Sequence, residues 1–353
     1  MTLFLIGVAA IWGLGTWAGL AKSLRIGLTA ALFGLILLTH AIFPPGHPLA
    51  ALFGGSFAGW ATFAGAVALI ALYARGVGWL RARAAGPAEA SVESPNEAPA
   101  QGRFSPTELD RYARHIVLRE VGGPGQRALK DARVLVVGAG GLGSPALLYL
   151  AAAGVGTIGV IDDDIVSNSN LQRQVIHRDA DIGTPKVFSA ERAMKAQNPH
   201  IAVRPYNRRL TEDIAPELIA DYDLVLEGSD NFATRYLVNR VAAKLGIPVV
   251  GGAISQWEGQ LAVWDPGSGA PCYQCVFPEA PAEGLAPSCA EAGVIGPLPG
   301  VIGTMMATEA IKILTEAGTP LRSRLLLWDG LDAEPRVIRT SKREDCPVCG
   351  TGG

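Results

Sequence analysis

The chain has 353 residues, of which 49% are hydrophobic and only 18% are charged. Because soluble domains carry about 25% charged residues, this composition argues against an ordinary, fully soluble protein. The formal net charge is −2, from 30 basic and 32 acidic residues. That balance excludes a strongly basic nucleic-acid-binding protein, and we expect no nucleic-acid partner.

Three long apolar stretches open the chain, at residues 2–20, 26–43 and 49–74. None contains Lys, Arg, Asp or Glu, and each is close to or above the ~18 residues needed to cross a bilayer. Residues 22–25 and 44–48 separate the stretches and are predicted to form interhelical turns. The sequence therefore predicts about three transmembrane helices, with a cleaved signal peptide or a buried helical bundle as the alternatives.

Basic residues flank these stretches asymmetrically. Lys22 and Arg25 lie in the first break, whereas the second break has neither Lys nor Arg, and three arginines follow the third stretch. The positive-inside rule places both basic clusters in the cytoplasm, so we expect a multi-pass protein of the inner (cytoplasmic) membrane with a cytoplasmic catalytic domain. His40 is the one potentially charged side chain within the stretches, which favours a lipid anchor or a partner-docking site over a transport pathway.

The chain changes character after the third stretch. Residues 84–103 are rich in Ala, Pro, Glu and Ser and contain almost no large apolar side chain, so they are predicted to form a flexible linker. The remaining residues, 104–353, are numerous enough to bury a sizeable core. The predicted organisation is a membrane domain at 1–83, a linker at 84–103 and a globular domain at 104–353.

The globular part alternates between short apolar runs and helical stretches. This alternation predicts an α/β fold built on an open, doubly wound sheet. Past residue 259 the pattern changes to a further, antiparallel part. Strands are predicted at 133–137, 157–161, 201–206, 224–226, 248–250, 260–264 and 324–328, and helices at 143–153, 186–197 and 232–245.

A glycine-rich loop, GAGGLG at residues 138–143, follows the first predicted strand and opens a helix. Glycines there let the backbone approach phosphate groups, and the helix N-terminus supplies N–H donors. Asp162 closes the second strand, where an acid can hold a ribose hydroxyl, although a solvated acidic turn is the simpler interpretation. This loop alone fits NAD, FAD or ATP.

Charged residues at the ends of later elements favour ATP. Arg173 follows the second strand and Lys186 begins a helix, and together they can neutralise a triphosphate. Either cation alone is more simply a surface charge. Asp230 follows the fourth strand, where α/β sheets bind ligands, and its carboxylate can hold Mg²⁺ against phosphates.

The five cysteines form two pairs and a single residue. Cys272 with Cys275 and Cys346 with Cys349 are two CxxC pairs about 70 residues apart, which suits a closed tetrahedral site for structural Zn²⁺. Two redox-active CxxC pairs are the alternative. Cys289 is left over in a segment with Gly and Pro, and it is either an inert thiol or a nucleophile.

Several motifs occur together in chain order. They are RYARH at residues 111–115, VGAGGLGS, DDDIVSNSNLQRQ, GTPK, GSDN, PCYQC, EAGVIGPLPGVIG and CPVCG. The set resembles the MoeB/ThiF/HesA family of E1-like adenylyltransferases over roughly residues 104–350, and the resemblance covers nothing of residues 1–103. It implies a Rossmann-like sheet of E1/ThiF type with a zinc-knuckle C-terminal part.

The resemblance also implies an activity. Such proteins use ATP and Mg²⁺ to adenylate the C-terminal glycine of a ubiquitin-like sulfur carrier, releasing pyrophosphate. We therefore expect a MoaD-like or ThiS-like carrier as partner, a separate sulfur donor and a homodimer, in which Arg114 reaches into the partner's site. The resemblance assigns nucleotide-site roles to Gly141, Asp162, Ser169, Asn170, Gln172, Arg173, Lys186, Asp230 and Asn231, with Arg173 and Asp230 as catalytic residues.

In the same family the CxxC pairs bind zinc, and Cys289 matches a cysteine that forms a carrier-linked intermediate in some members. One departure lies at Glu227, where many relatives have aspartate, and we expect little effect on the chemistry. Adenylation of ThiS or of another acceptor is the alternative within the family. An NAD-dependent oxidoreductase and a non-catalytic membrane scaffold are the alternatives outside it.

Overall fold

The computed structural model describes residues 2–44, 47–84, 104–282 and 292–350. The chain divides into two compact units, Met1–Glu97 and Ala98–Gly353. The predicted linker, apart from Ala84, and Cys289 lie outside the described residues.

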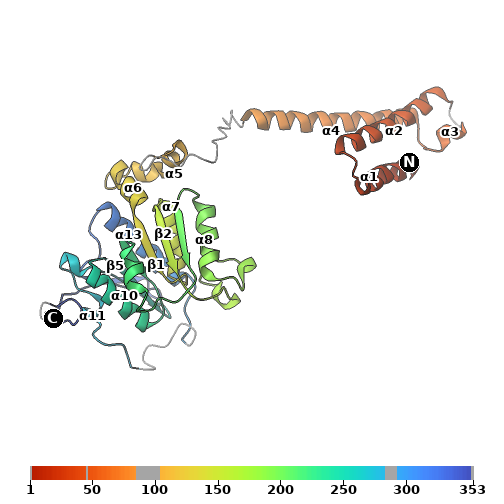
Figure 1. Ribbon diagram of the computed structural model, residues 1–353. Helices are drawn as coiled ribbons and strands as arrows, with labels where there is room; N and C mark the ends of the chain where they lie inside the picture. Colours follow the sequence, from red (N-terminus) through yellow and green to blue (C-terminus); the bar gives the residue numbers. More distant parts are fainter. Residues whose placement is uncertain (1, 45–46, 85–103, 283–291, 351–353) are drawn as a thin grey trace. The chain divides into compact units, whose positions relative to one another are not determined.

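The N-terminal unit consists of helices (Figure 1): α1 (Thr2–Trp17), α2 (Lys22–Ile42), α3 (Pro48–Ala51) and α4 (Phe57–Ala84). By length and composition, two segments could cross a membrane, namely α2 and residues Phe57–Val77 of α4, each with a mean hydropathy of 1.7. Helix α1 has 16 residues and is shorter than a typical span.

Two details of the predicted helix boundaries were wrong. Residues 22–25 form the first turn of α2, and the chain instead turns before them, where Gly19 adopts a φ of 69°. Residues 49–74 do not form one helix, because α3 ends at Ala51 and α4 begins at Phe57. Gly54 and Gly55, with φ values of 67° and 82°, break the helix in the left-handed region that glycine tolerates.

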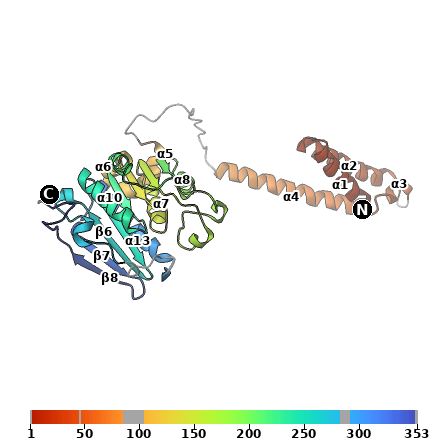
Figure 2. The same cartoon turned by 60° about the horizontal axis from the view of Figure 1, so that its bottom comes forward.

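The C-terminal unit is built on one eight-stranded sheet in the order β3-β2-β1-β4-β5-β6-β7-β8. Strands β1 to β5 are parallel, and β6, β7 and β8 join antiparallel at one end (Figure 2). This topology confirms the predicted Rossmann-like sheet with an antiparallel extension. The strands are β1 (Arg133–Val137), β2 (Thr157–Ile161), β3 (Ala202–Tyr206), β4 (Leu224–Glu227), β5 (Val249–Ser255), β6 (Glu258–Trp264), β7 (Arg324–Asp329) and β8 (Glu334–Arg339).

Helices cover both faces of this sheet. Val134 and Val136 of β1 belong to the core under α7, α8 and α13, whereas Leu135 and Val137 belong to the core under α9 and α10. Successive side chains of a strand point to opposite faces, so β1 is an unbroken apolar run because it is buried on both sides. The longer helices are α5 (Pro106–Ile116), α6 (Gly122–Asp131), α7 (Gly143–Ala153), α8 (Lys186–Gln197), α9 (Ala215–Ala220), α10 (Phe232–Leu245) and α13 (Pro297–Thr315).

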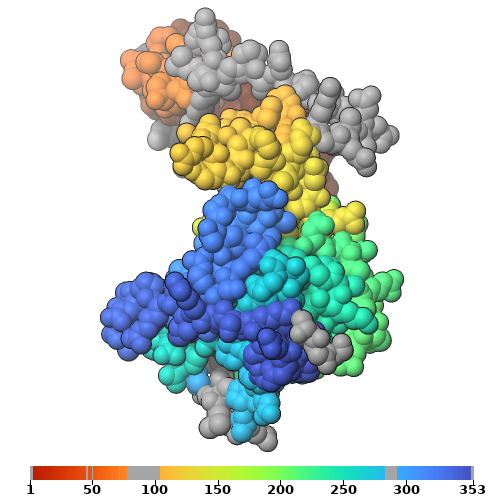
Figure 3. Space-filling view, turned by 90° about the vertical axis from the view of Figure 1, so that its left-hand side faces the viewer, coloured from red at the N-terminus to blue at the C-terminus, as the bar shows by residue number. Residues whose placement is uncertain are grey.

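Segments far apart in sequence meet beside α7. Helix α13 packs against α6 as well as α7, and Figure 3 shows the yellow surface of α5 and α6 next to blue C-terminal residues. Tight packing explains several glycines here. A Cβ on Gly303 of α13 would lie 2.3 Å from the carbonyl oxygen of Leu142, so only glycine lets α13 approach the start of α7 this closely.

Candidate active site and metal centre

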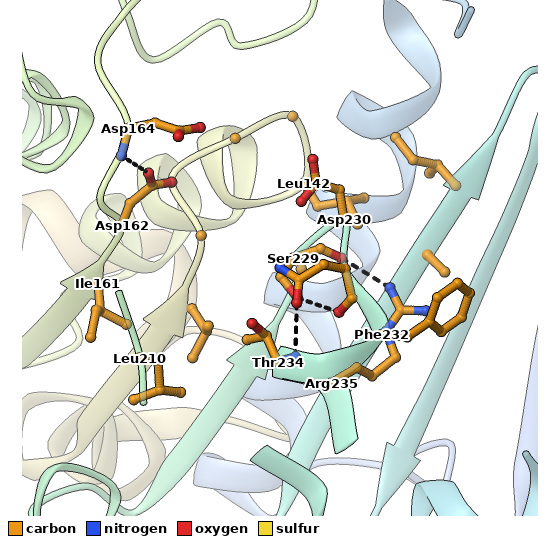
Figure 4. A pocket seen from close by; sticks show the side chains of 18 of the residues that line it. Leu142, Ile161, Asp162, Asp164, Leu210, Ser229, Asp230, Phe232, Thr234 and Arg235 are labelled. Atoms are coloured by element: carbon orange, nitrogen blue, oxygen red, sulfur yellow. Dashed lines mark hydrogen bonds between the residues drawn. The ribbon is translucent and has the colours of Figure 1, made fainter. Parts of the chain in front are cut away.

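A cavity of about 840 Å³ opens at the carboxyl ends of β1, β2, β4 and β5. In open α/β sheets this edge is where ligands bind. Figure 4 shows Asp162 and Asp164 on one wall, and Ser229 and Asp230 on the opposite wall. The space between them is large enough for a nucleotide.

The glycine-rich loop forms the floor between these walls. Gly138 has a φ of 96°, and a Cβ on Gly143 would lie 1.9 Å from the carbonyl oxygen of Gly138, so both positions require glycine. Among the described residues, no hydrogen-bond partner is found for the backbone N–H groups of Gly140, Gly141 and Leu142. These free donors at the N-terminus of α7 form an anion-binding site.

Asp162 holds this loop in place from the end of β2. Its two carboxylate oxygens accept the N–H groups of Ala139, at 2.7 Å, and of Asp164, at 2.8 Å. Burial raises the pKa of Asp162, although the positive charge of Lys186 opposes that shift. Each oxygen keeps a further lone pair, so the carboxylate can still accept a ribose hydroxyl.

Two cations face the same cavity. Lys186 is the first residue of α8, its side chain is only 6% exposed, and its Nζ lies 2.7 Å from Oδ2 of Asp164. Arg173 is half-buried and donates from Nη1 to the carbonyl of Ser169 at 3.1 Å. Because Asp164 is itself largely exposed, the Lys186 amine can turn from this partner to a phosphate at little cost.

The opposite wall carries the candidate metal ligand. Asp230 is exposed to the cavity, and within the described parts of the chain its carboxylate has no hydrogen-bond partner. Asn231 caps α10, because its Oδ1 accepts the N–H of Thr234 at 2.8 Å. The Asp230 carboxylate faces two cations and the N–H groups of the glycine-rich loop. This arrangement fits a Mg²⁺ ion that is bound together with phosphates.

A buried ion pair supports the loop that carries Asp230. Glu227, the last residue of β4, is 2% exposed and accepts Nε of Arg235 at 3.0 Å. It also accepts the N–H of Ser229 at 2.8 Å and the Ser229 hydroxyl, while Arg235 donates from Nη2 to the Ser229 carbonyl at 3.0 Å. Both charged side chains therefore hold Ser229, the residue directly before Asp230.

The structure brings most of the sequence-predicted residues together. Gly141, Asp162, Arg173, Lys186, Asp230 and Asn231 all line the cavity. Ser169, Asn170 and Gln172 lie in the turn around Arg173 and do not line it, and Arg114 is exposed on α5, away from the cavity. Further polar residues that were not predicted from the sequence also line the cavity, among them Gln174, Arg208, Arg209 and Arg235.

The four paired cysteines form a second cluster. Their Sγ atoms all lie within 4.8 Å of one another, with Sγ–Sγ distances of 3.9 Å for Cys272–Cys275, 3.6 Å for Cys272–Cys346 and 3.4 Å for Cys275–Cys349. Tetrahedral zinc with bonds of about 2.3 Å places sulfur atoms about 3.8 Å apart. The cluster therefore fits a structural Zn²⁺ ion.

Two polar groups around the cluster support this assignment. Asn239 donates from Nδ2 to Sγ of Cys272 at 3.7 Å, and the N–H of Arg343 donates to Sγ of Cys275 at 3.4 Å. Such N–H donors stabilise thiolates and orient metal ligands. None of the four thiols is in a disulfide.

Comparison with known proteins agrees with this geometry. The model of the ThiF family matches residues 112–348, and the chain belongs to this family. It is 51% identical over 247 residues to the SAMP-activating enzyme E1 of Haloferax volcanii, which covers 70% of this chain and 91% of that protein. It is also 51% identical over 252 residues to the sulfur carrier protein adenylyltransferase of Thermus thermophilus, covering 70% and 93%.

A longer relative and two solved structures are also similar. The probable adenylyltransferase/sulfurtransferase MoeZ of Mycobacterium tuberculosis is 50% identical over 69% of this chain and 63% of that protein. E. coli MccB with ATP matches with a TM-score of 0.60 at 22% identity, over 71% of this chain and 77% of MccB. PaaA matches at 0.59 and 23%, over 74% and 81%. At these identities the two structures support the fold alone.

Proposed function

We propose that this protein uses ATP to adenylate the C-terminal glycine of a ubiquitin-like sulfur carrier. One observation carries the proposal. Across one cavity, a glycine loop faces Lys186, Arg173 and Asp230, and neither the loop N–H donors nor the Asp230 carboxylate has a partner among the described residues. The relative from Thermus thermophilus, whose name is sulfur carrier protein adenylyltransferase, supports the same reaction.

The chemistry follows from where the charges lie. A carboxylate oxygen of the carrier attacks the α-phosphorus of ATP, a new O–P bond forms, and the bond to the β-phosphate oxygen breaks with its electron pair leaving on pyrophosphate. Negative charge grows on the phosphate oxygens, and Arg173, Lys186 and the loop N–H groups are placed to stabilise it. Asp230 would hold Mg²⁺, which supplies further positive charge against the phosphates.

The reaction needs little acid–base chemistry from the protein. The nucleophile is already ionised at neutral pH, so the site has mainly to align two anions and neutralise their repulsion. We therefore assign Arg173 and Asp230 to charge stabilisation and metal binding. The further role of Cys289 stays a prediction, because that residue lies outside the described parts of the chain.

ATP–pyrophosphate exchange tests the activity. Full-length protein in detergent is assayed with a MoaD-like or a ThiS-like carrier, and we expect exchange with the MoaD-like one. Asp230→Asn should reduce exchange about 10²–10³-fold, as loss of a transition-state charge contact does, whereas Glu217→Gln, an exposed acid on α9, should not change it. Exchange with ThiS alone would reassign the carrier, and unchanged exchange in Asp230→Asn would refute the proposed site.

We also propose a homodimer with composite sites, in which Arg114 acts in the partner's cavity. Its exposure on α5, away from its own cavity, supports this role. Arg114→Ala and Asp230→Asn should each be inactive, yet mixed dimers of the two would contain one intact site. Mixing should then restore about a quarter of the activity. If both residues acted in the same subunit, mixing would restore nothing.

We propose further that the N-terminal helices anchor the protein in the inner membrane. Large apolar side chains on α1, α2 and α4 are exposed, among them Trp17 at 89% and Leu72 at 71%, and lipid would cover them. The protein should stay in the membrane fraction after carbonate washing. Release into the supernatant would contradict the proposal.

A further inference from the structure

A buried histidine holds the glycine loop from behind. His177 is 6% exposed and does not line the cavity. Its Nε2 lies 2.9 Å from the carbonyl oxygen of Ala139, and its Nδ1 lies 2.9 Å from Oγ of Ser189 on α8. One imidazole thus joins the loop that carries the free N–H groups to the helix that begins with Lys186.

The partner of Nε2 defines its role as a hydrogen-bond donor. A carbonyl oxygen only accepts, so Nε2 carries a proton and donates it to Ala139. The Ser189 hydroxyl has a single proton, which it donates to Oδ2 of Asp181 at 2.8 Å, so its oxygen faces Nδ1 as an acceptor.

The peptide unit between Ala139 and Gly140 links the His177 hydrogen bond to the direction of the Gly140 N–H. The described backbone contains no cis peptide bond, and in a planar trans peptide the C=O and the following N–H point in opposite directions. With the Ala139 carbonyl held towards His177, the N–H of Gly140 points away from the histidine. Gly140 lines the cavity and His177 does not, so this N–H lies on the cavity side of the loop.

We propose that His177 is a positioning residue for phosphate binding, which aims the Gly140 N–H into the cavity by holding the Ala139 carbonyl behind it. Without this donor the peptide is free to rotate, and its carbonyl oxygen would face the phosphates and repel them. Asp162 fixes only the preceding N–H, that of Ala139. The inference rests on the proposed function, because it takes ATP as the ligand.

Nucleotide binding to full-length protein in detergent separates this role from simple packing. Glutamine carries its amide nitrogen about as far from the backbone as Nε2 of histidine, whereas asparagine reaches only to the position of Nδ1. We expect His177→Asn to weaken ATP binding about tenfold, and His177→Gln to keep it within about threefold of the natural protein. Adenosine, which has no phosphates, should bind all three proteins within about twofold.

The possible outcomes decide between the two roles. Equal weakening of ATP and adenosine in His177→Asn, or no weakening of either, would overturn the inference, since packing rather than phosphate contact would then be the role of the ring. If His177→Asn does not fold, Ser189→Ala takes its place, and we expect it to weaken ATP two- to threefold more than adenosine. Natural protein that binds no ATP would refute the proposed function itself, and the inference with it.

Discussion

Replacing Glu227 by alanine should be among the most damaging single changes in the C-terminal unit. The carboxylate is 2% exposed, and it accepts Nε of Arg235 and both the N–H and the hydroxyl of Ser229. Alanine removes all of these contacts at once. The Arg235 guanidinium, whose side chain is only 14% exposed, would stay in place without its counter-charge.

The magnitude follows from that burial. Breaking a buried ion pair by removing one partner costs about 3–5 kcal/mol, because the remaining charge is neither hydrated nor paired. An exposed pair would cost only about 0.2–1 kcal/mol. For a folding unit of about 250 residues, the larger loss lowers the melting temperature by roughly 6–20 °C. The loop before Asp230 also loses its support, so exchange activity should fall even where the variant is folded.

Thermal and denaturant unfolding of the full-length protein measure this loss, with Glu227→Gln as the matched variant. Glutamine keeps an oxygen for Ser229 but loses the charge, so its effect should lie between those of alanine and the natural residue. Adding Arg235→Leu to Glu227→Ala should recover part of the stability, since it removes the stranded charge. A loss below about 1 kcal/mol in Glu227→Ala would refute the reasoning, because the pair would then behave as an exposed one.

Three further predictions concern other parts of the C-terminal unit. Elemental analysis should find one zinc ion per chain. The Cys349→Ser variant should lose the metal and more than about 3 kcal/mol of its free energy of unfolding. Natural protein that is free of metal but has normal stability would contradict this prediction. Burial raises the pKa of Glu108, but hydrogen bonds from Lys130 and Ser105 outweigh that effect, so the pKa is lowered overall. The contribution of the ionised Glu108 to folding stability is therefore complete above its ordinary pKa of 4.5 and is lost as the pH falls through the lowered pKa. Glu108→Gln should therefore cost about 1–2 kcal/mol at pH 7 and progressively less as the pH falls below 4.5, and a loss independent of pH would argue against the ion pair. Gly143→Ala should lower the free energy of unfolding by about 2–3 kcal/mol and abolish ATP binding, because its Cβ would lie 1.9 Å from the carbonyl oxygen of Gly138. The control variant Gly123→Ala, which has open space around its Cβ, should change neither stability nor ATP binding.

Four of the five parallel strands and the helices α7, α8 and α10 agree with their predicted bounds to within one residue, whereas β5 extends to Ser255, beyond the predicted 248–250, and α9 was not predicted. Residues 133–137 and 157–161 are strands, and 186–197 and 232–245 are helices, within the bounds that the apolar runs and the breaks at Asn198 and Gly246 indicate. Such elements are buried on a whole face, and burial leaves its pattern directly in the chain. The same reasoning located the glycine loop, Lys186 and Asp230, because ligand-binding residues of this fold follow strand ends.

Other parts could not be predicted because tertiary packing decides them. Helix α13 begins with the sequence Pro297-Leu-Pro-Gly, which by local preference favours a turn, yet its glycines allow close packing on α7. Strand β8 is exposed along its whole length and gives no apolar alternation. His177 and Glu227 acquire their roles from partners that only the fold brings near, since Ala139 is 38 residues from His177 in sequence.

Acidic residues at the ends of β2 and β4, the strands on either side of β1, have two different roles in this cavity. Asp162 after β2 and Glu227 at the end of β4 both accept backbone N–H groups of loops beside the ligand space. Asp230 lies three residues after Glu227 and has no such partner among the described residues. A carboxylate that accepts no backbone N–H group has both of its oxygens fully available to a metal ion. The sequence alone shows only acids after strands, so it could not separate the residues that hold the loops from Asp230, the Mg²⁺ ligand that we propose.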